Sequence, residues 1–448
     1  MTNQFSLYSD LRDRISNKTA DIMTVGLGYV GLPLALTIHE SGFRATGLDL
    51  NAARVDAINA GKQVISYFEE DRISRAIASG RFAATADPAR ISDMDVVLIC
   101  VPTPLGEDRE PDLAYVRRAA TMIADHLRPG QLIVLESTVW PGATDTVVRP
   151  ILEKAGLKAG RDFFLGFSPE REDPGNHSHT TRSIPKIVGA DDTQSGDLLN
   201  LFYTNVVDKT VPVSSTATAE AVKLTENSFR TVNIALVNEM KVAFDAMGVD
   251  VWEVVTAAAT KPFGYMPFYP GPGIGGDCIP VSPAYLSWRA RDVGSATPII
   301  DLARGNNEYA PRDLSNRIAG ALAARGQDIG TARLLMLGVA YKKDVEDTRE
   351  SPALEALLCL EGMGAKVEYH DPYFPVMPAT RDHPTLAGRE SHALTAESLS
   401  DFDAVMIMTD HTKVDYALVA NHAALVFDAR NAMDGRAIEM DRSKLIKI

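Results

Sequence analysis

Hydrophobic residues in the first half of the chain fall in short runs that alternate with stretches of helical periodicity. The runs IMTVGLG (22–28), RATGLDL (44–50) and DVVLICVP (95–102) indicate buried strands, and helices are expected from about Gly31 and about Ala52. Strand–helix alternation predicts βαβ units on a parallel sheet with helices on both faces. Further strands are expected in the segments QLIVLEST, FFLGFSPE, PKIVGA and KTVPVSS.

A long helical pattern then interrupts the alternation. Residues 216–248 contain no proline and a single, terminal glycine, which predicts a central helix. Helical signals continue to about Arg325, and the alternation resumes with ARLLMLGVAY, AKVEYHDP, DAVMIMTD and ALVFDARN. The expected fold class is therefore α/β, with two doubly wound Rossmann-like domains joined by a long central helix and a helical middle domain. The boundaries that we expect are 1–213, 214–325 and 326–448.

Composition narrows the classes of partner. The net charge of -14 argues against nucleic acid or an anionic membrane as a partner. No apolar run approaches the ~20 residues of a membrane span, and the N-terminal segment lacks an apolar signal core, so a cytoplasmic location is expected. The three cysteines, Cys100, Cys278 and Cys359, are widely spaced and lack the paired arrangement of a zinc site. We therefore expect neither a metal nor a disulfide.

The segment VGLGYVGLPLA carries Gly26, Gly28 and Gly31 in the G-x-G-x-x-G spacing, directly between a predicted strand and a predicted helix. This arrangement lets a pyrophosphate approach the backbone at a helix N-terminus. Asp49 ends the second strand, at the place where an acid accepts the ribose hydroxyls, and an acid there favours NAD over NADP. Glycines that serve only a turn are the less favoured alternative.

Other candidate cofactor contacts surround this turn. Two motifs, ICVPTP (99–104) and ESTVWPG (136–142), each end a strand at the edge where such folds bind ligands, although a plain strand-terminating loop is an equally good interpretation. The candidates in these segments and beside the glycines are Tyr29, Val30, Arg54, Pro102, Thr103 and Thr138.

Lys223 and Asn227 are four residues apart on the predicted central helix and therefore share a face. Their apolar neighbours, Ala221, Val222 and Leu224, favour partial burial, which would make the ammonium a positioned donor to developing negative charge. A solvated surface lysine is the alternative, and this pattern alone does not choose between them.

The segment YPGPGIGGDCIPVSP (269–283) crowds glycine and proline around Cys278. Its glycines would let the backbone approach a ligand, and Ser282 as N-cap with Pro283 would begin a helix just after the cysteine. The positive end of a helix stabilises a thiolate, although most free cysteines are small buried hydrophobes. A thiolate beside NAD suggests that an alcohol is oxidised to an aldehyde, which Cys278 captures. A second hydride transfer would give a thioester, and hydrolysis would give an acid with two NAD consumed.

These motifs, in this order from about Ile22 to Gly435, resemble the UDP-glucose/GDP-mannose dehydrogenase family, and specifically its bacterial UDP-N-acetylhexosamine 6-dehydrogenase branch. The resemblance is carried by GLGYVGLPLA, CVPTP, STVWPG, FSPEREDPGN, AEAVKLTENSFRTVNIALVNE, TKPFGYMPFYPGPGIGGDCIP, GVAYKKDVEDTRESPALE and DARN. It implies that the three predicted domains are an NAD-binding domain, a central dimerisation and catalytic domain, and a C-terminal nucleotide-sugar-binding domain. It also implies a homo-oligomer built on the central helix.

The resemblance implies a role for each matching residue. Cys278 matches the nucleophile, Lys223 and Asn227 the pair that stabilises oxyanions, Glu170 an acid that assists proton transfer or thioester hydrolysis, and Thr138 a hydroxyl that positions water. Arg349 resembles a cofactor contact. The positions that resemble substrate-binding ones are Glu170, Arg171, Lys223, Asn227, Lys261, Tyr269, Gly271, Gly275, Lys342 and Arg430; among these, Lys261 resembles a residue lent to the neighbouring subunit.

Two positions depart from the family pattern. Ser282 stands where relatives usually carry an aspartate, and Asp277 stands where this branch usually has histidine. The missing carboxylate puts thioester hydrolysis in question, and Asp277 would oppose formation of the Cys278 thiolate by like-charge repulsion. Alternatively, Ser282 only caps the helix and Glu170 carries the water chemistry.

The leading hypothesis is four-electron oxidation of UDP-GlcNAc or UDP-GalNAc to the uronic acid. A UDP-glucose 6-dehydrogenase is the related alternative. A two-electron β-hydroxyacid dehydrogenase would need neither the cysteine nor the second α/β domain. An NAD- or sugar-nucleotide-binding homologue with impaired hydrolysis is the non-enzyme alternative, and it rests on Asp277 and Ser282.

Overall fold

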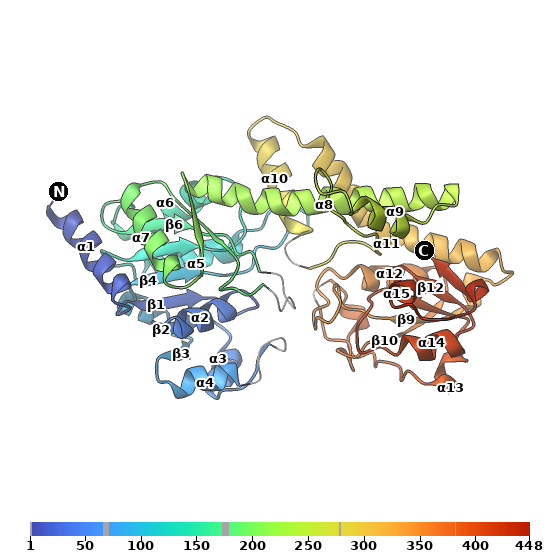
Figure 1. Cartoon of the computed structure of the whole chain (residues 1–448). Helices are drawn as coiled ribbons and strands as arrows, with labels where there is room; N and C mark the ends of the chain where they lie inside the picture. The colour runs from blue at the N-terminus through green and yellow to red at the C-terminus, as the bar shows by residue number, and fades with distance from the viewer. Residues whose placement is uncertain (1, 66–70, 173–178, 277–278, 381) are drawn as a thin grey trace. The chain divides into compact units, whose positions relative to one another are not determined.

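The protein is described by a computed structural model that covers residues 2–65, 71–172, 179–276, 279–380 and 382–448. The chain divides into two compact units, one made of residues 1–226 and 284–296 and the other of residues 227–283 and 297–448. The long helix α8 (Thr216–Met247) contains the boundary between them (Figure 1). The three-part domain division with the boundaries expected above stays a prediction.

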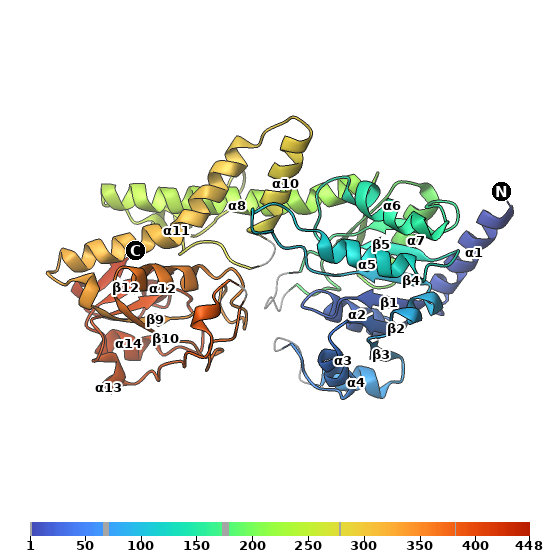
Figure 2. The ribbon, with the colours of Figure 1, turned by 180° about the vertical axis from the view of Figure 1, so that it is seen from behind.

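The first unit is built on an eight-stranded sheet in the order β3-β2-β1-β4-β5-β6-β7-β8. Its central strands β4 and β5 are apolar throughout, because helices cover both faces: α2 and α7 lie on one side and α5 on the other (Figures 1 and 2). The strands are β1 (Asp21–Val25), β2 (Arg44–Leu48), β3 (Phe82–Thr85), β4 (Val96–Ile99), β5 (Leu132–Leu135), β6 (Phe164–Phe167), β7 (Lys186–Ala190) and β8 (Thr210–Val213). The helices are α2 (Gly31–Glu40), α3 (Ala52–Asn59), α4 (Arg72–Ala78), α5 (Ala114–Ala124), α6 (Arg149–Leu152) and α7 (Thr193–Thr204).

The sheet is parallel except between β6 and β7, which run antiparallel. Parallel neighbours need a crossover that returns the chain to the same end of the sheet, whereas antiparallel neighbours do not. No helix is described between these two strands, so the chain re-enters the sheet from the end at which it left. The loop between them carries Glu170 and Arg171.

The N-terminal segment, to which the sequence assigned no role, contains the helix α1 (Thr2–Ser16). Leu11 and Ile15 of this helix are buried in the core of the first unit. Its Arg14 donates to the Asp95 carboxylate at 2.9 Å. Apolar packing with a partly buried ion pair fixes the helix to the outside of the sheet.

The second unit contains most of α8 together with α9 (Val251–Ala258), α11 (Pro298–Ala323) and a parallel sheet in the order β10-β9-β11-β12-β13. The strands are β9 (Arg333–Leu337), β10 (Lys366–His370), β11 (Ala404–Ile407), β12 (Val426–Asp428) and β13 (Leu445–Lys447). Alternate strand residues face two separate cores, one with α11 and α12 (Pro352–Gly362) and one with α13 (Ala396–Leu399), α14 (Tyr416–His422) and α15 (Ala432–Gly435). This second α/β sheet confirms the predicted fold class.

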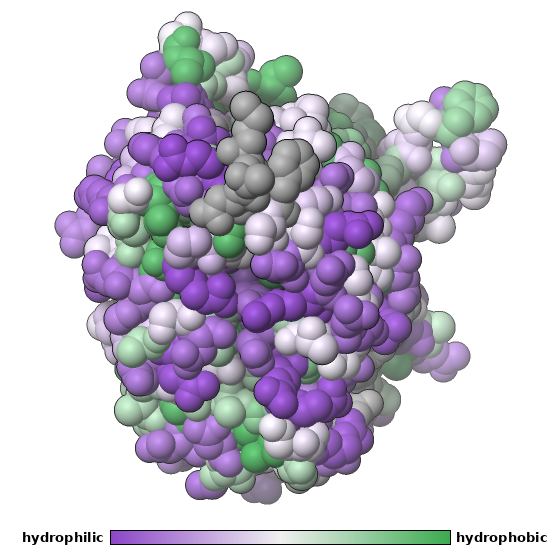
Figure 3. Space-filling model, turned by 90° about the vertical axis from the view of Figure 1, so that its left-hand side faces the viewer, coloured by the Kyte–Doolittle hydropathy of each residue, from purple (hydrophilic) through white to green (hydrophobic). Residues whose placement is uncertain are grey.

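On the face shown in Figure 3, hydrophilic side chains predominate and hydrophobic ones are scattered, which is the usual surface of a folded domain in water. Within the described parts of the chain, no helix is long and apolar enough to cross a membrane.

Candidate active site

The glycine-rich turn between β1 and α2 has the geometry that a dinucleotide requires. A Cβ on Gly31 would overlap the carbonyl oxygen of Gly26, so the helix starts against the turn only because Gly31 has no side chain. A Cβ on Gly28 would meet no atom within 4 Å, so the backbone there is open to a bulky group. Tyr29 is exposed and Val30 half-buried beside it. The turn therefore fits a pyrophosphate at a helix N-terminus.

Asp49 lies at the end of β2, as predicted. Its carboxylate accepts hydrogen bonds from the backbone N–H of Leu27 at 2.9 Å and of Asn51 at 2.9 Å. Arg54 forms an ion pair with the same carboxylate at 3.2 Å. The carboxylate is thus held beside the glycine turn, within the same unit, where it can accept ribose hydroxyls.

The loops after β4 and β5 are fastened to each other. The Ser137 hydroxyl accepts from the backbone N–H of Val101 at 3.0 Å and donates to its carbonyl at 2.7 Å. This bridge fixes the segment that carries Pro102 and Thr103. Thr138 follows on the β5 side and is half-buried. These residues lie at the carboxyl ends of parallel strands, as the sequence indicated.

Lys223 is buried rather than solvated. Its ammonium lies 3.2 Å from the Glu170 carboxylate, and the two side chains are 6% and 10% exposed. The backbone N–H of Glu172 donates to the other oxygen of the same carboxylate. The structure thus brings together two residues, 53 positions apart in the chain, that the sequence placed in one site. Arg171, a predicted substrate contact, lies between Glu170 and Glu172 in the chain and pairs with Glu226 at 3.2 Å.

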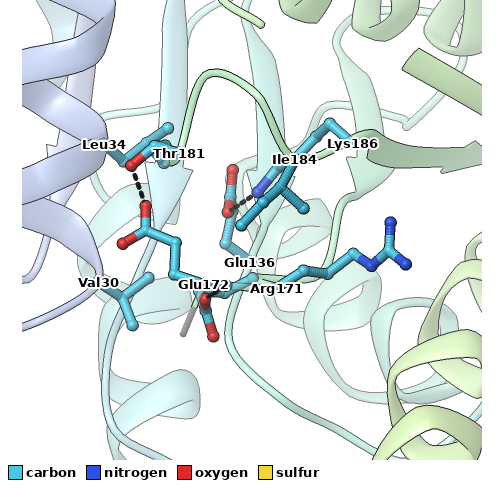
Figure 4. A pocket seen from close by; sticks show the side chains of 9 residues that line it. Val30, Leu34, Glu136, Arg171, Glu172, Thr181, Ile184 and Lys186 are labelled. Carbon is cyan, nitrogen blue, oxygen red and sulfur yellow. Dashed lines mark hydrogen bonds and ion pairs between the residues drawn. The ribbon is translucent and has the colours of Figure 1, made fainter. Parts of the chain in front are cut away.

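A second buried ion pair was not predicted. Lys186 at the start of β7 lies 2.6 Å from the Glu136 carboxylate, which also accepts from the Tyr203 hydroxyl. Lys186 and Glu136 line one pocket together with Glu170 and Glu172 (Figure 4). An acid directly after an apolar strand, as in LIVLE, was the signal available in the sequence.

Glu220, one turn before Lys223 on α8, is another residue that the sequence analysis missed. It is fully buried and accepts hydrogen bonds from the backbone N–H groups of Gly142 at 2.5 Å and Thr144 at 2.8 Å. Burial raises the pKa of its carboxyl, while the hydrogen bonds to Thr144 and Gly142 oppose that shift. Glu220 therefore fixes the start of α8 to the loop that follows Thr138.

Asn227 is buried four residues after Lys223 on α8, and its side-chain amide donates to the Ser282 hydroxyl at 2.8 Å. The expected N-cap role of Ser282 is wrong, because α10 (Val281–Asp292) begins one residue earlier and places Ser282 in its first turn. The hydroxyl is instead a buried partner of Asn227. Cys278 and Asp277 lie outside the described residues.

The glycine loop packs on the C-terminal part of its own unit. A Cβ on Gly275 would lie 2.6 Å from the Cβ of Tyr341 and 2.7 Å from the Glu350 carbonyl oxygen. Gly271 donates its N–H to Asn238 at 2.9 Å. Gly275 therefore lacks a side chain because its backbone packs closely on Tyr341 and Glu350, and this close packing explains the glycine without a ligand.

The remaining predicted substrate and cofactor residues lie on the second unit. Tyr269 stacks on Trp252 with ring centroids 5.5 Å apart, and exposed Lys261 lies over the Phe263 ring. Half-buried Lys342 and Arg349 follow β9, where Arg349 pairs with Asp347 at 2.6 Å. Arg430 follows β12, 3.5 Å from Asp410. These three predicted basic residues therefore lie beyond the carboxyl ends of the strands of the C-terminal sheet, where such sheets bind ligands.

Comparison with known proteins agrees with this geometry. Three domains of the UDP-glucose/GDP-mannose dehydrogenase family match the chain: the NAD binding domain at residues 20–207, the central domain at 217–309 and the UDP binding domain at 335–435. A UDP-N-acetyl-D-glucosamine 6-dehydrogenase of Pseudomonas aeruginosa is 33% identical over 88% of this chain and 92% of its own.

Two further relatives are named for the oxidation of other sugars. An NDP-N-acetyl-D-galactosaminuronic acid dehydrogenase of Ralstonia solanacearum is 33% identical over 88% of this chain and 91% of its own. The solved structure of a UDP-D-ManNAc dehydrogenase from Pyrococcus horikoshii superposes with a TM-score of 0.83 at 32% identity, covering 92% of this chain and 96% of the other.

The turn that fits a pyrophosphate lies within the matched NAD binding domain, and the matched UDP binding domain accounts for the second sheet. The match to the NAD binding domain confirms NAD as the cofactor. The family match and the relatives confirm that the enzyme is an oxidoreductase. The chain therefore belongs to the UDP-glucose/GDP-mannose dehydrogenase family and is an NAD-dependent nucleotide-sugar dehydrogenase.

Proposed function

We propose that this enzyme oxidises the C6 hydroxymethyl of a UDP-N-acetylhexosamine, UDP-GlcNAc or UDP-GalNAc, to the uronic acid through a thioester on Cys278. The observation that supports this proposal most strongly is the buried Lys223–Glu170 pair, which supplies a cation for an oxyanion and a carboxylate for protons. The relatives named for N-acetylated sugars support the choice of substrate class.

Each residue then has a defined task. When bound, NAD accepts hydride from the carbon that is oxidised. Cys278 adds to the aldehyde carbonyl, and Lys223 and Asn227 stabilise the oxygen that gains negative charge. Glu170 takes up a proton, and Thr138 orients the water that opens the thioester. Lys342, Arg430, Tyr269 and Lys261 contact the nucleotide sugar, and Arg349 the cofactor.

The role of Ser282 determines whether the second half of the reaction proceeds. Its hydroxyl accepts from Asn227, so the amide keeps a buried partner although the aspartate usual at this position is missing. We propose that Ser282 preserves the orientation of Asn227 and that Glu170 carries the water chemistry. A homologue with impaired hydrolysis is the competing proposal.

The test is to count NADH per sugar. The enzyme with excess NAD is offered UDP-GlcNAc, UDP-GalNAc, UDP-ManNAc and UDP-glucose, and we expect two NADH per sugar with UDP-GlcNAc or UDP-GalNAc. UDP-ManNAc belongs in the panel because of the Pyrococcus relative. A higher kcat/KM for UDP-glucose would contradict the substrate proposal. A burst of two NADH per active site that then stops, with an intact-mass shift on Cys278, would establish the impaired homologue, because the thioester forms only after the second hydride transfer.

We also propose a homo-oligomer formed through α8 and α11. Apolar side chains are exposed on both helices, among them Leu236, 53% exposed on α8, and Ile299, 69% exposed on α11. Exposed large apolar side chains are enriched at subunit interfaces. A second copy of the chain is the proposed occupant, because the relatives of this family assemble on the central helix.

Leu236→Lys should therefore weaken the assembly, because it buries an ammonium in the proposed interface. We expect the dissociation constant to rise by about 100-fold, in line with the 2–5 kcal/mol that unpaired buried charges cost interfaces. Sedimentation velocity across a dilution series measures it. Val376→Lys is the matched control, since Val376 is also 53% exposed but lies on neither helix. A wild-type monomer, or equal effects of the two substitutions, would contradict the proposal.

A further inference from the structure

Glu172 lies in the pocket of the first unit beside Glu170, and neither the family match nor the predicted mechanism gives it a role. Its carboxylate accepts from the Thr181 hydroxyl, and it is half-buried (Figure 4). The side chain of Arg171, its neighbour in the chain, extends away from it (Figure 4). Arg171 and Glu172 both line the pocket, but the guanidinium pairs with Glu226 and not with Glu172.

The pocket brings together more acids than bases. Glu136 has Lys186 at 2.6 Å and Glu170 has Lys223 at 3.2 Å, whereas the hydrogen-bond partner of Glu172 is a neutral hydroxyl. When the Arg171–Glu226 pair at the edge of the pocket is counted as well, there are four carboxylates and three cations, so the fully ionised set would carry one uncompensated negative charge. A partly buried cluster of this kind lowers its energy by binding one proton.

The residues around the pocket indicate which of the carboxyl groups binds this proton. Val30, just before α2, and Leu34 of α2 line one side of the pocket, and the loop after residue 178 contributes Thr181 and Ile184. Burial and the neighbouring Glu170 raise the pKa of Glu172 to about 7, with Glu136 acting in the same direction, while Thr181 and Lys186 lower it. Near neutral pH, Glu172 therefore exists in both protonation states.

We propose that Glu172 is a positioning residue for Glu170: it shares the proton of this carboxyl cluster and passes the protons released by the reaction from Glu170 to water. This inference rests on the proposed function only for the role of Glu170. Each alcohol oxidation releases hydride and one proton, and the proton is what Glu170 hands to Glu172. The Glu172 backbone N–H already donates to Glu170, so the two carboxyls are held in one loop segment.

The test joins a direct titration with a pH profile. Infrared difference spectra between pH 6 and pH 8 should contain a protonated-carboxyl band that titrates near pH 7 and disappears in Glu172→Gln. In the same variant, kcat above pH 8 should fall by ~10–100-fold, with KM for the UDP-sugar changed less than two-fold. The acid limb near pH 7 should disappear, and Glu172→Asp should restore it. Imidazole should partly rescue the glutamine variant, since it can carry protons in place of the carboxyl.

Glu153→Gln is the matched control, because this carboxyl pairs with Lys158 on the surface. An unchanged infrared titration in Glu172→Gln would overturn the proposal without touching the proposed function, since this readout needs no turnover. A lower kcat with an unchanged profile and no rescue would reduce Glu172 to a structural part of the loop, and would also overturn it. Loss of all turnover in the wild type would instead contradict the proposed function.

Discussion

Cys278→Ala should abolish formation of the uronic acid, with a loss of at least ~1,000-fold in kcat. The variant lacks the nucleophile that captures the aldehyde, so the second hydride transfer has no covalent intermediate from which to start. NADH formation and mass spectrometry of the sugar product measure the effect. We expect at most traces of NADH and no acid.

Cys278→Ser tests the same step from another direction. An oxygen nucleophile would form an ester, which water opens far more slowly than a thioester, so the sugar should stay on the protein as an intact-mass shift. Cys359→Ala is the matched control, because Cys359 is a half-buried thiol on α12 whose pKa is raised mainly by burial. Full turnover of Cys278→Ala would refute the proposed mechanism.

The sequence predicted the strands well where hydrophobicity alone determines them. β4 and β5 are continuous apolar runs between polar segments, and both lie where expected. Several elements were not predicted, among them β3, β13 and α1. β3 and β13 are short edge strands with weak patterns. The residues of α1 are polar on average, so its position depends on the few apolar side chains that pack on the first unit, among them Leu11 and Ile15. The antiparallel β6–β7 pair depends on a connection that local patterns do not describe.

In the candidate site, too, local sequence patterns were sufficient for some residues, whereas others depend on partners that are distant in the chain. A spacing rule suffices for Gly26, Gly28 and Gly31, because their function depends on local backbone geometry. Burial of Lys223 was left open, since an apolar neighbourhood on a helix does not reveal its partner. Glu170, 53 residues earlier in the chain, provides that partner. Glu172 was missed for a similar reason, because its altered pKa results from neighbours on three separate segments.

Lys223→Met should affect catalysis and stability together. The methionine removes the donor to the developing oxyanion, which should lower kcat by about 100- to 1,000-fold. It also leaves the Glu170 carboxylate in a pocket where its side chain is 10% exposed. Breaking a buried ion pair on one side costs about 3–5 kcal/mol, so the free energy of unfolding should fall by that order. Steady-state kinetics and urea unfolding measure the two effects.

The double variant Lys223→Met/Glu170→Gln separates them. Removing the orphaned charge should restore most of the lost stability, because an uncharged amide is far cheaper to bury than a carboxylate. It should restore no activity, because both the cation and the proton acceptor are absent. Lys158→Met is the control for losing an ion pair as such: its partner Glu153 lies on the surface, where a pair contributes about 0–1 kcal/mol. If Lys223→Met were no more destabilising than Lys158→Met and kept kcat within threefold, the buried pair would be a structural contact, and the oxyanion role proposed for Lys223 would be wrong.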